Sequence, residues 1–403
     1  MWIVISLRAI LKNNHVGPLE EYFRTGLITK EPGFIDNRFC SNKNENSETM
    51  NEIFDTIVIG GGQSGLGCGY YLRRAQLNFL ILDKQSVPGG AWLHAWESLT
   101  LFSPAEYSSL PGWFMPKSDH KFPLRTEVID YLAKYEEHYQ LPVKHGVEVT
   151  EITKENGVFQ VHASQGIFKA KAVISATGTW GNPFIPKLEG IDEYKGIQIH
   201  SANYKTPADF VGLKTLVVGE GNSGAQIVAE VSKVTEVKWS TRKEPEFLPD
   251  EVDGYYLFNV ASAKYKAEKE GKPFDASQYN LGNIVMVPPV KEARQRGVLV
   301  SEGTFQKLYD KGVIWDNGEK EEFDAIIWCT GFGYDTSYLK SLIPTDERGT
   351  ANTTESKSLD VEGLWLVGYG GWTGYASATL VGLNRTAKLT VQQIEEFLES
   401  NNK

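Results

Sequence analysis

The sequence predicts an α/β fold, because the same succession of strand, glycine-rich turn and helix occurs twice in the chain. The first copy spans residues 54–67 and the second residues 214–224. In each copy a short apolar run rich in β-branched residues is typical of a buried strand, and a helical pattern follows the glycines. A chain of 403 residues is long enough to bury the cores of two domains.

The first glycine-rich turn has the spacing of a dinucleotide-binding fingerprint. Gly60 permits a tight turn, Gly62 lets the backbone approach a pyrophosphate, and Gly65 lets helix and strand pack closely. The next strand ends at Asp83, whose carboxylate can accept hydrogen bonds from ribose hydroxyls. The N–H groups and the positive dipole end at the helix N-terminus favour phosphate. A glycine-rich turn without a ligand is the alternative, and the ordered succession of elements disfavours it.

The second unit repeats this pattern but ends its second strand differently. Its fingerprint glycines are Gly219, Gly221 and Gly224. The following strand ends in Thr241, Arg242 and Lys243 and not in an acid. A guanidinium at Arg242 can bind a 2′-phosphate with two hydrogen bonds, whereas an acid would repel it; a solvated basic turn is the alternative. The two units therefore predict two dinucleotides, one with a plain ribose and one with a phosphorylated ribose.

The composition excludes several classes of partner and site. A net charge of −10 disfavours nucleic acid and anionic membranes as main partners. Residues 1–10 are apolar but too few to span a membrane, and they lack the features of a signal peptide. Cys40, Cys68 and Cys329 form no Cys-x-x-Cys pair, so a dithiol relay or a zinc ribbon has no support. We expect a cytoplasmic protein without a metal site. The sequence leaves open whether the protein forms a homodimer.

The chain divides into regions of different character. Residues 1–49 carry no periodic pattern and are expected to form a disordered N-terminal extension. Residues 50–205 and 325–403 are assigned to the first dinucleotide-binding domain, and residues 206–324 to the second. Within the second domain, residues 244–300 form an insertion that is too long for an idle connection and is expected to shape a wall on the substrate side.

From about residue 52 to its end, the chain resembles the bacterial flavin-containing monooxygenases, which are class B flavoprotein monooxygenases. Besides the two fingerprints, the resemblance rests on residues 89–92 (Gly-Gly-Ala-Trp), 176–181 (Ala-Thr-Gly-Thr-Trp-Gly) and 328–332 (Trp-Cys-Thr-Gly-Phe). It also rests on residues 194–204, which are similar to the family signature Phe-x-Gly-x-x-x-His with Tyr194 in place of the phenylalanine.

The resemblance implies two Rossmann-like dinucleotide-binding domains, the second inserted into the first, with FAD on the first and NADPH on the second. NADPH would reduce the flavin, and dioxygen would add to it as a C4a-hydroperoxide. This adduct would oxygenate soft nucleophiles among small organic substrates: thioethers to sulfoxides, amines to N-oxides, and strained ketones by Baeyer–Villiger oxidation. An NAD(P)H oxidase or flavin reductase that releases peroxide is one alternative, and a non-catalytic dinucleotide-binding redox sensor is another.

The fingerprints and the resemblance together give a set of candidate site residues. The candidates for cofactor binding are Gly60, Gly62, Gln63, Ser64, Gly65, Asp83, Lys84, Gly90, Ala91, Trp92, Val149, Thr177, Gly178, Gly219, Gly221, Asn222, Ser223, Gly224, Thr241, Arg242, Lys243, Thr330, Gly331 and Gly371. The candidates for catalysis are Trp92, Phe102, His200 and Asn222. A lone histidine is more often structural, and only the surrounding signature makes His200 a candidate.

Three positions depart from the family pattern. Phe102 stands where many members place an asparagine that supports the oxygen adduct, so appreciable leakage to peroxide is expected. Gly371 stands where members usually place an aspartate on the ribityl chain, which weakens the expected hold on the flavin. The Trp-Pro pair that follows the signature histidine in typical Baeyer–Villiger enzymes is missing after His200.

Overall fold

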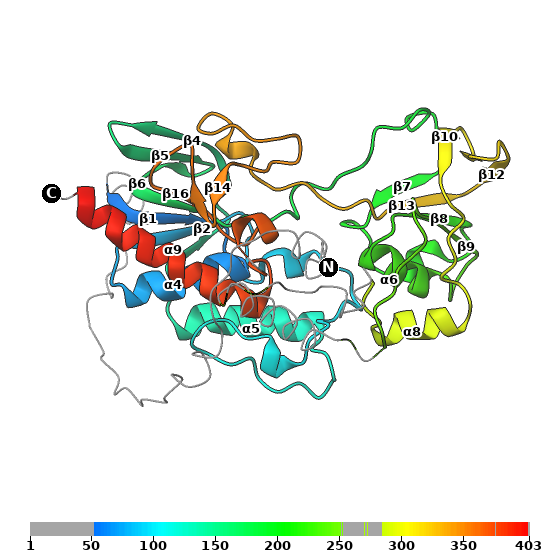
Figure 1. Ribbon diagram of the computed structural model, residues 1–403, viewed down its shortest axis with the longest axis horizontal. Coiled ribbons are helices and arrows are strands. Elements are labelled where there is room, and N and C mark those ends of the chain that lie inside the picture. Colours follow the sequence, from blue (N-terminus) through cyan, green and yellow to red (C-terminus); the bar gives the residue numbers. More distant parts are fainter. Residues whose placement is uncertain are drawn as a thin grey trace.

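The computed structural model describes residues 52–250, 252, 270, 272, 284–374 and 376–401. The predicted N-terminal extension lies outside these residues, as do parts of the predicted insertion 244–300. The described chain forms two lobes, which two extended segments connect (Figure 1).

The larger lobe is built on a nine-stranded sheet whose middle strands are parallel. Strand β1 (Ile53–Ile59) lies between β2 (Phe79–Asp83) and β6 (Gly166–Ser175). The side chains of Ile57 and Val58 are fully buried, as the apolar run predicts. The other strands are β3 (Val143–His145), β4 (Val149–Glu155), β5 (Val158–Ala163), β14 (Thr353–Thr354), β15 (Lys357–Ser358) and β16 (Leu364–Leu366).

Three helices accompany this sheet. Helix α4 (Gln63–Arg74) begins directly after the first glycine turn, with Gly62 as its N-cap residue, and packs against the C-terminal helix α9 (Leu380–Asn401). Helix α5 (Arg125–His138) buries one face that includes Tyr131 and Tyr135. Short 3-10 helices lie at η1 (Gly90–Leu93), η2 (Ala105–Tyr107), η3 (Pro207–Phe210), η5 (Ser337–Leu339) and η6 (Gly371–Thr373).

The smaller lobe has a parallel four-stranded sheet in the order β7-β13-β8-β9. Its strands are β7 (Ile197–His200), β8 (Thr215–Val218), β9 (Val237–Ser240) and β13 (Ala325–Trp328). Helices α6 (Asn222–Val231) and α8 (Pro288–Gln295) pack against each other on this lobe, as Figure 1 shows. A small antiparallel sheet consists of β10 (Phe305–Tyr309), β11 (Gly312–Trp315) and β12 (Lys320–Glu322).

The second unit is inserted into the first, which confirms the predicted fold class. Strands β6 and β16 are hydrogen-bonded neighbours in the larger sheet, although the whole smaller lobe separates them in the sequence. The predicted limits of the second domain, residues 206–324, are narrower than its sheet, because β7 and β13 pair in parallel with each other and β13 pairs with β8. We therefore propose that the second domain extends outward to include both strands.

The two crossing segments, residues 176–196 and 329–352, are held together where they pass between the lobes. The backbone N–H of Phe184 donates to the carbonyl of Gly331 at 3.0 Å.

Among the helices that the structure describes, none is long and apolar enough to cross a membrane. No cluster of three His, Cys, Asp or Glu side chains within the described residues is placed to hold a metal ion.

Candidate active site

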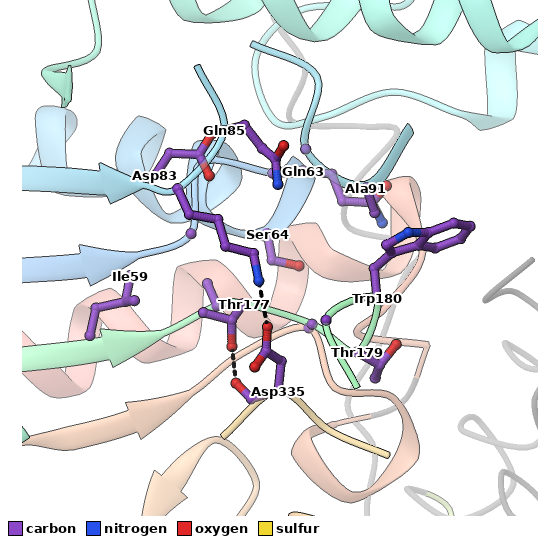
Figure 2. Close-up of a pocket in the computed structure, with 18 of the residues that line it drawn as sticks. Ile59, Gln63, Ser64, Asp83, Gln85, Ala91, Thr177, Thr179, Trp180 and Asp335 are labelled. Carbon is purple, nitrogen blue, oxygen red and sulfur yellow. Dashed lines mark hydrogen bonds and ion pairs between the residues drawn. The ribbon is translucent and has the colours of Figure 1, made fainter. Parts of the chain in front are cut away.

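A cavity of about 610 Å³ opens beside the first glycine turn, between the carboxyl ends of the strands in the larger lobe (Figure 2). Its walls come from separate segments that are brought together by the parallel strand order. The sequence-predicted residues that line it are Gly60, Gly62, Gln63, Ser64, Asp83, Lys84, Gly90, Ala91, Trp92, Val149, Thr177 and Gly178.

The glycines of the first turn have two different roles. Gly60 and Gly65 leave no room for a side chain, whereas Gly62 leaves space for a ligand. A Cβ on Gly60, at a φ of +105°, would lie 2.6 Å from the carbonyl oxygen of Ala176. A Cβ on Gly65 would lie 1.8 Å from the carbonyl oxygen of Gly60, so helix and strand are in close contact here. Gly62 is different, because its Cβ would meet only Gly90 at 3.8 Å, and both residues line the cavity. The predicted division of roles among these glycines fits this geometry.

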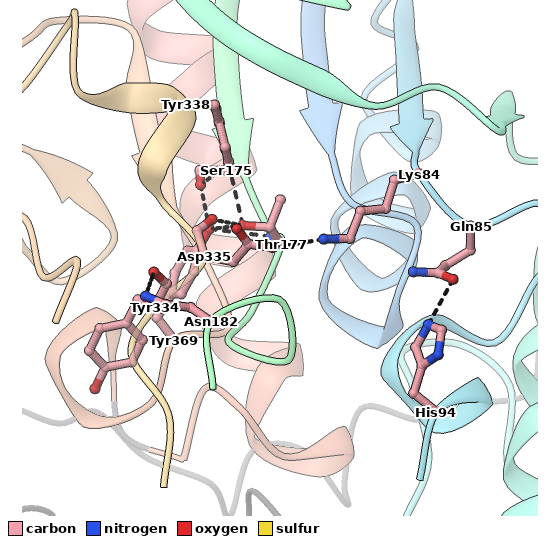
Figure 3. A network of polar contacts seen from close by, with 10 residues as sticks. All are labelled: Lys84, Gln85, His94, Ser175, Thr177, Asn182, Tyr334, Asp335, Tyr338 and Tyr369. Atoms are coloured by element: carbon pink, nitrogen blue, oxygen red, sulfur yellow. Dashed lines mark hydrogen bonds and ion pairs between the residues drawn. The ribbon is translucent and has the colours of Figure 1, made fainter. Parts of the chain in front are cut away.

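Charged side chains stand at the end of β2. The Asp83 side chain lines the cavity and is only 5% exposed, and its Oδ2 atom accepts no hydrogen bond from the described residues. The next residue, Lys84, forms an ion pair with Asp335 of the second crossing segment at 2.9 Å (Figure 3). His145 Nδ1 lies 3.2 Å from Asp83 Oδ2 without forming a hydrogen bond, so Oδ2 keeps the capacity to accept one from a ligand.

Trp92 lines the cavity and is held by hydrogen bonds within the larger lobe. Its Nε1 atom donates to Gln63 Oε1 at 3.3 Å, and Gln63 Nε2 donates to the carbonyl of Ala378 at 2.6 Å. Arg125 on α5 donates to the carbonyls of Trp92 and Leu93 at 2.8 and 2.7 Å. Trp92 is therefore fixed at two points, its ring nitrogen and its backbone carbonyl.

The segment after Trp92 also joins the two lobes. Ser98 and Tyr204 donate to the two oxygens of the Glu230 carboxylate on α6, the second at 2.8 Å. Burial raises the pKa of the Glu230 carboxyl, and the hydrogen bond from Ser98 opposes this rise. Helix α6 and the segment that follows Trp92 are therefore connected by a polar contact that is partly buried.

A network of hydroxyl groups holds the back of the cavity (Figure 3). Thr177 Oγ1 donates to the carbonyl of Asp335 at 2.5 Å and contacts the Tyr369 hydroxyl at 2.6 Å. Tyr338 and Tyr369 both contact the Ser175 hydroxyl. Thr330, the corresponding threonine after β13, donates to the carbonyl of Phe184 at 2.5 Å. Both threonines thus bind one crossing segment to the other, and neither Thr330 nor Gly331 lines the cavity.

The second glycine turn has the same geometry as the first. A Cβ on Gly224 would lie 2.2 Å from the carbonyl oxygen of Gly219, and Gly219 itself has a φ of +130°. By contrast, nothing lies within 4 Å of a Cβ on Gly221, so this backbone is open for a ligand to approach. Asn222 and Ser223 begin α6, and Asn222 Oδ1 accepts the backbone N–H of Val285 at 2.8 Å.

Arg242 lies at the outer end of this second turn. Its side chain is 83% exposed and pairs with Glu220, the residue between the first two fingerprint glycines, at 3.2 Å. Thr241 is buried, and its hydroxyl donates to the carbonyl of Lys243 at 2.7 Å. The predicted phosphate ligand Arg242 therefore has an acidic neighbour that the sequence-based prediction did not consider.

Phe102, Gly371 and His200 do not line the cavity either. Phe102 is 9% exposed and packs into the apolar core that extends toward α6. Gly371 begins η6 with open space around its Cβ position, and Gly368 is the nearest residue in sequence that lines the cavity. His200 is 3% exposed, and Nε2 donates to the carbonyl of Gly331 at 2.8 Å while Nδ1 accepts the N–H of Ala202. Their roles toward cofactor or substrate stay predictions.

We expect His200 to make the protein less stable in acid. Burial lowers the pKa of His200 to about 4, whereas an unfolded chain has its ordinary value of 6.5. Between these values the unfolded state binds more protons than the folded state, so stability falls as the pH drops from 7 toward 4. From pH 7 to 4.5 the loss due to this histidine is about 2 kcal/mol.

Urea unfolding of wild type and His200→Gln at both pH values measures this loss, since the glutamine keeps an N–H donor but does not titrate. The variant should lose about 2 kcal/mol less than wild type over that interval. Equal losses would show that the folded protein accommodates a protonated His200. Activity at pH 7 supplies the second readout. If His200 is catalytic, the His200→Gln substitution should lower activity without changing this stability difference.

Several residues that line the cavity are absent from the predicted site residues. Trp180 and His94 line the cavity, and their rings lie 6.4 Å apart. Burial, helped by Lys205, lowers the pKa of His94. Tyr338 and Asp335 come from the second crossing segment. A tyrosine or an aspartate in a loop carries no periodic signal. Trp180, in contrast, belongs to residues 176–181, on which the family resemblance rests.

The described cysteines are not placed for redox chemistry. Cys68 on α4 and Cys329 after β13 are both free and buried. Burial raises the pKa of the Cys68 thiol to about 12 and that of Cys329 further still. A protonated thiol is a poor nucleophile, so neither is suited to attack a disulfide.

Known proteins are similar to this chain over most of its length. Residues 57–255 match the pyridine nucleotide-disulphide oxidoreductase family. The chain is 29% identical over 349 residues to an uncharacterized CzcO-like oxidoreductase of Geobacillus kaustophilus, with 86% of this chain and 99% of that protein covered. It is 24% identical to the probable indole-3-pyruvate monooxygenase YUCCA4 of Arabidopsis thaliana, with 88% of this chain and 92% of the relative covered.

A solved structure gives the stronger comparison. The flavin-containing monooxygenase from Stenotrophomonas maltophilia is 46% identical, covers 86% of this chain and 99% of its own, and superimposes with a TM-score of 0.79. A double mutant of the same Stenotrophomonas enzyme matches equally well. The chain therefore belongs to the flavin-containing monooxygenase family and is a flavoprotein oxidoreductase of that type.

Proposed function

We propose that this protein is an FAD- and NADPH-dependent monooxygenase that transfers one atom of dioxygen to a soft nucleophile in a small organic molecule. Thioethers and amines are the expected substrates, and strained ketones are a further class. The observation that carries the proposal is the pairing of two glycine turns, one of which opens on a cavity lined by the buried carboxylate of Asp83, while the other carries Arg242. Membership of the flavin-containing monooxygenase family supports it.

The residues of the larger lobe fit FAD. Gly62 and Gly90 keep the backbone free of side chains where a pyrophosphate would lie, and the N-terminus of α4 would face its charge. Asp83 would accept the hydroxyls of the adenosine ribose. Trp92 would cover the isoalloxazine ring from the cavity wall, because its own ring is fixed by Gln63.

The residues of the smaller lobe fit NADPH. Gly221 leaves open space at the start of α6, where the pyrophosphate would approach the helix N-terminus. Arg242 would bind the 2′-phosphate in place of its present partner Glu220. Asn222 is held by the N–H of Val285, so its side chain would border this nucleotide from a fixed position.

When bound, the flavin supplies the redox chemistry: it accepts hydride from NADPH and activates dioxygen for transfer to the substrate. The protein's own part is to position both dinucleotides and to exclude water. Trp92, Ala95, Leu99 and Trp180 line the cavity and give it an apolar wall. No side-chain nucleophile is needed for this reaction class, and the buried, protonated state of the described cysteines agrees with that.

Product analysis in the presence of catalase tests the proposal. Purified protein, NADPH, air and an aryl alkyl thioether should give sulfoxide that persists when catalase removes free peroxide. Because Phe102 is packed in the core and offers no hydrogen-bond donor, part of the NADPH consumed should still appear as peroxide in the absence of catalase. Sulfoxide that disappears with catalase would leave an NAD(P)H oxidase. A protein that binds both nucleotides but whose flavin is never reduced by NADPH would be the redox sensor.

A further inference from the structure

Three titratable side chains form a buried row behind the end of β2. Asp83 ends β2, His145 ends β3, and the parallel register of these strands makes the two residues neighbours. Glu136 reaches the row from α5. His145 Nδ1 lies 3.2 Å from Asp83 Oδ2, and His145 Nε2 lies 3.0 Å from Glu136 Oε1. The exposed fractions of the Asp83, His145 and Glu136 side chains are 5%, 19% and 15%.

His145 is the middle member of the row. Each of its ring nitrogens faces a carboxylate oxygen: Nε2 is within hydrogen-bond distance of Glu136 Oε1 at 3.0 Å, and Nδ1 lies 3.2 Å from Asp83 Oδ2. The contact with Glu136 therefore fixes the orientation of the ring beside Asp83. Burial raises the pKa of the Glu136 carboxyl, and the hydrogen bond with His145 opposes this rise.

Asp83 is the member of the row that reaches the cavity. Its Oδ2 atom is buried and accepts no hydrogen bond in the described structure, and His145 Nδ1 and Glu136 Oε2 are likewise without one. A Cβ on Gly61 would lie 3.0 Å from Asp83 Oδ2, so the glycine turn presses against the carboxylate from the other side. The carboxylate is therefore confined between His145 and the turn, with the cavity as its remaining open side.

We propose that His145, anchored by Glu136, is a positioning residue that orients the Asp83 carboxylate toward the vicinal hydroxyls of the adenosine ribose of FAD. The inference rests on the proposed binding of FAD in this cavity. Lys84, the residue after Asp83, is paired with Asp335 instead.

The test compares FAD with its analogue that lacks the 2′-hydroxyl of the adenosine ribose. Dissociation constants are measured on apoprotein for wild type, His145→Ala, Asp83→Asn and the double variant. Wild type should prefer FAD by about tenfold or more, the effect of a hydrogen bond to a charged acceptor. His145→Ala and Asp83→Asn should each reduce this preference to about twofold or less, and the double variant should reduce it no further.

Matched variants separate positioning from structure. His162→Ala removes another histidine of the same sheet, one that contacts Thr153 on β4, and should keep the tenfold preference. Glu136→Gln keeps an oxygen acceptor for His145 but removes its charge, so it should lower the preference to an intermediate value. If His145→Ala does not fold, an unchanged preference in Glu136→Gln alone overturns the inference.

The outcomes distinguish this inference from the proposed function. Equal weakening of FAD and its analogue in His145→Ala would show a general structural role and overturn the inference. Wild type that binds FAD without any preference over the analogue would do the same, because Asp83 would then not contact the ribose. Wild type that binds neither compound would overturn the proposed FAD site itself.

Discussion

Replacing Gly62 with alanine is expected to remove FAD from the protein without unfolding it, whereas Gly65→Ala is expected to prevent folding. A methyl group on Gly65 would lie 1.8 Å from the carbonyl oxygen of Gly60, and neither backbone can move without separating α4 from β1. A destabilisation above about 4 kcal/mol is the expected consequence. A methyl group on Gly62 meets only Gly90 at 3.8 Å, an ordinary contact. It would, however, fill the space that a pyrophosphate needs, so FAD affinity should fall by at least about a hundredfold.

The second turn provides the matched control. Gly221→Ala meets nothing within 4 Å, so it should fold and keep its flavin while binding NADPH at least about tenfold more weakly. Thermal unfolding, the ratio of flavin to protein absorbance, and the NADPH dependence of flavin reduction measure the three properties separately. Flavin loss in Gly221→Ala, or full flavin retention in Gly62→Ala, would show that the two nucleotides are assigned to the wrong turns.

The glycine turns could be predicted from the sequence because their demands are local. A chain that leaves a strand and enters a helix within a few residues must place Gly60 and Gly65 in contact, wherever the rest of the protein lies. The acid at the end of β2 and the arginine after β9 follow from the same succession of elements. The prediction of two dinucleotide-binding units needed nothing else, whereas the insertion of the second unit into the first was an implication of the family resemblance.

Long-range strand partners could not be predicted in this way. The apolar run of β13 resembles the run that leads to Thr177, and only its pairing with β7 and β8 places it in the smaller lobe. The row of Asp83, His145 and Glu136 exists because β3 is the parallel neighbour of β2, and no motif connects these residues. Helix α8 had a local signal that was not used, since the paired prolines at 288 and 289 are typical of a helix start.

Roles assigned through the family resemblance depend on where the fold places each residue. His200 matches the family signature, yet in this structure both of its ring nitrogens are bound by backbone groups. Phe102 occupies the position of a polar residue and packs into the core. In both cases burial decides which groups the side chain can contact. Burial depends on the assembled structure and not on the residue type.

The coenzyme preference of this protein is expected to depend on two residues of opposite charge, Arg242 and Glu220. Arg242→Ala should weaken NADPH by about ten- to a hundredfold, because charge-assisted hydrogen bonds to the 2′-phosphate contribute about 1.5–3 kcal/mol. NADH lacks this phosphate, so its affinity should change by less than about threefold. Lys243→Ala removes the next positive charge and should weaken NADPH binding by less than about threefold. This control shows how much of the affinity lost in Arg242→Ala is due to the loss of a positive charge alone.

Glu220 is expected to act in the opposite direction. Its carboxylate pairs with Arg242 at 3.2 Å and would have to give up this partner when a 2′-phosphate binds. The loss of this ion pair and the repulsion between the carboxylate and the phosphate both weaken NADPH binding. Glu220→Gln should therefore raise the affinity for NADPH by about fivefold. Added salt should narrow the difference between wild type and this variant, because the Arg242 side chain is 83% exposed and its charge is screened. Equal changes for NADPH and NADH in the Arg242 and Glu220 variants would place the phosphate elsewhere on the smaller lobe.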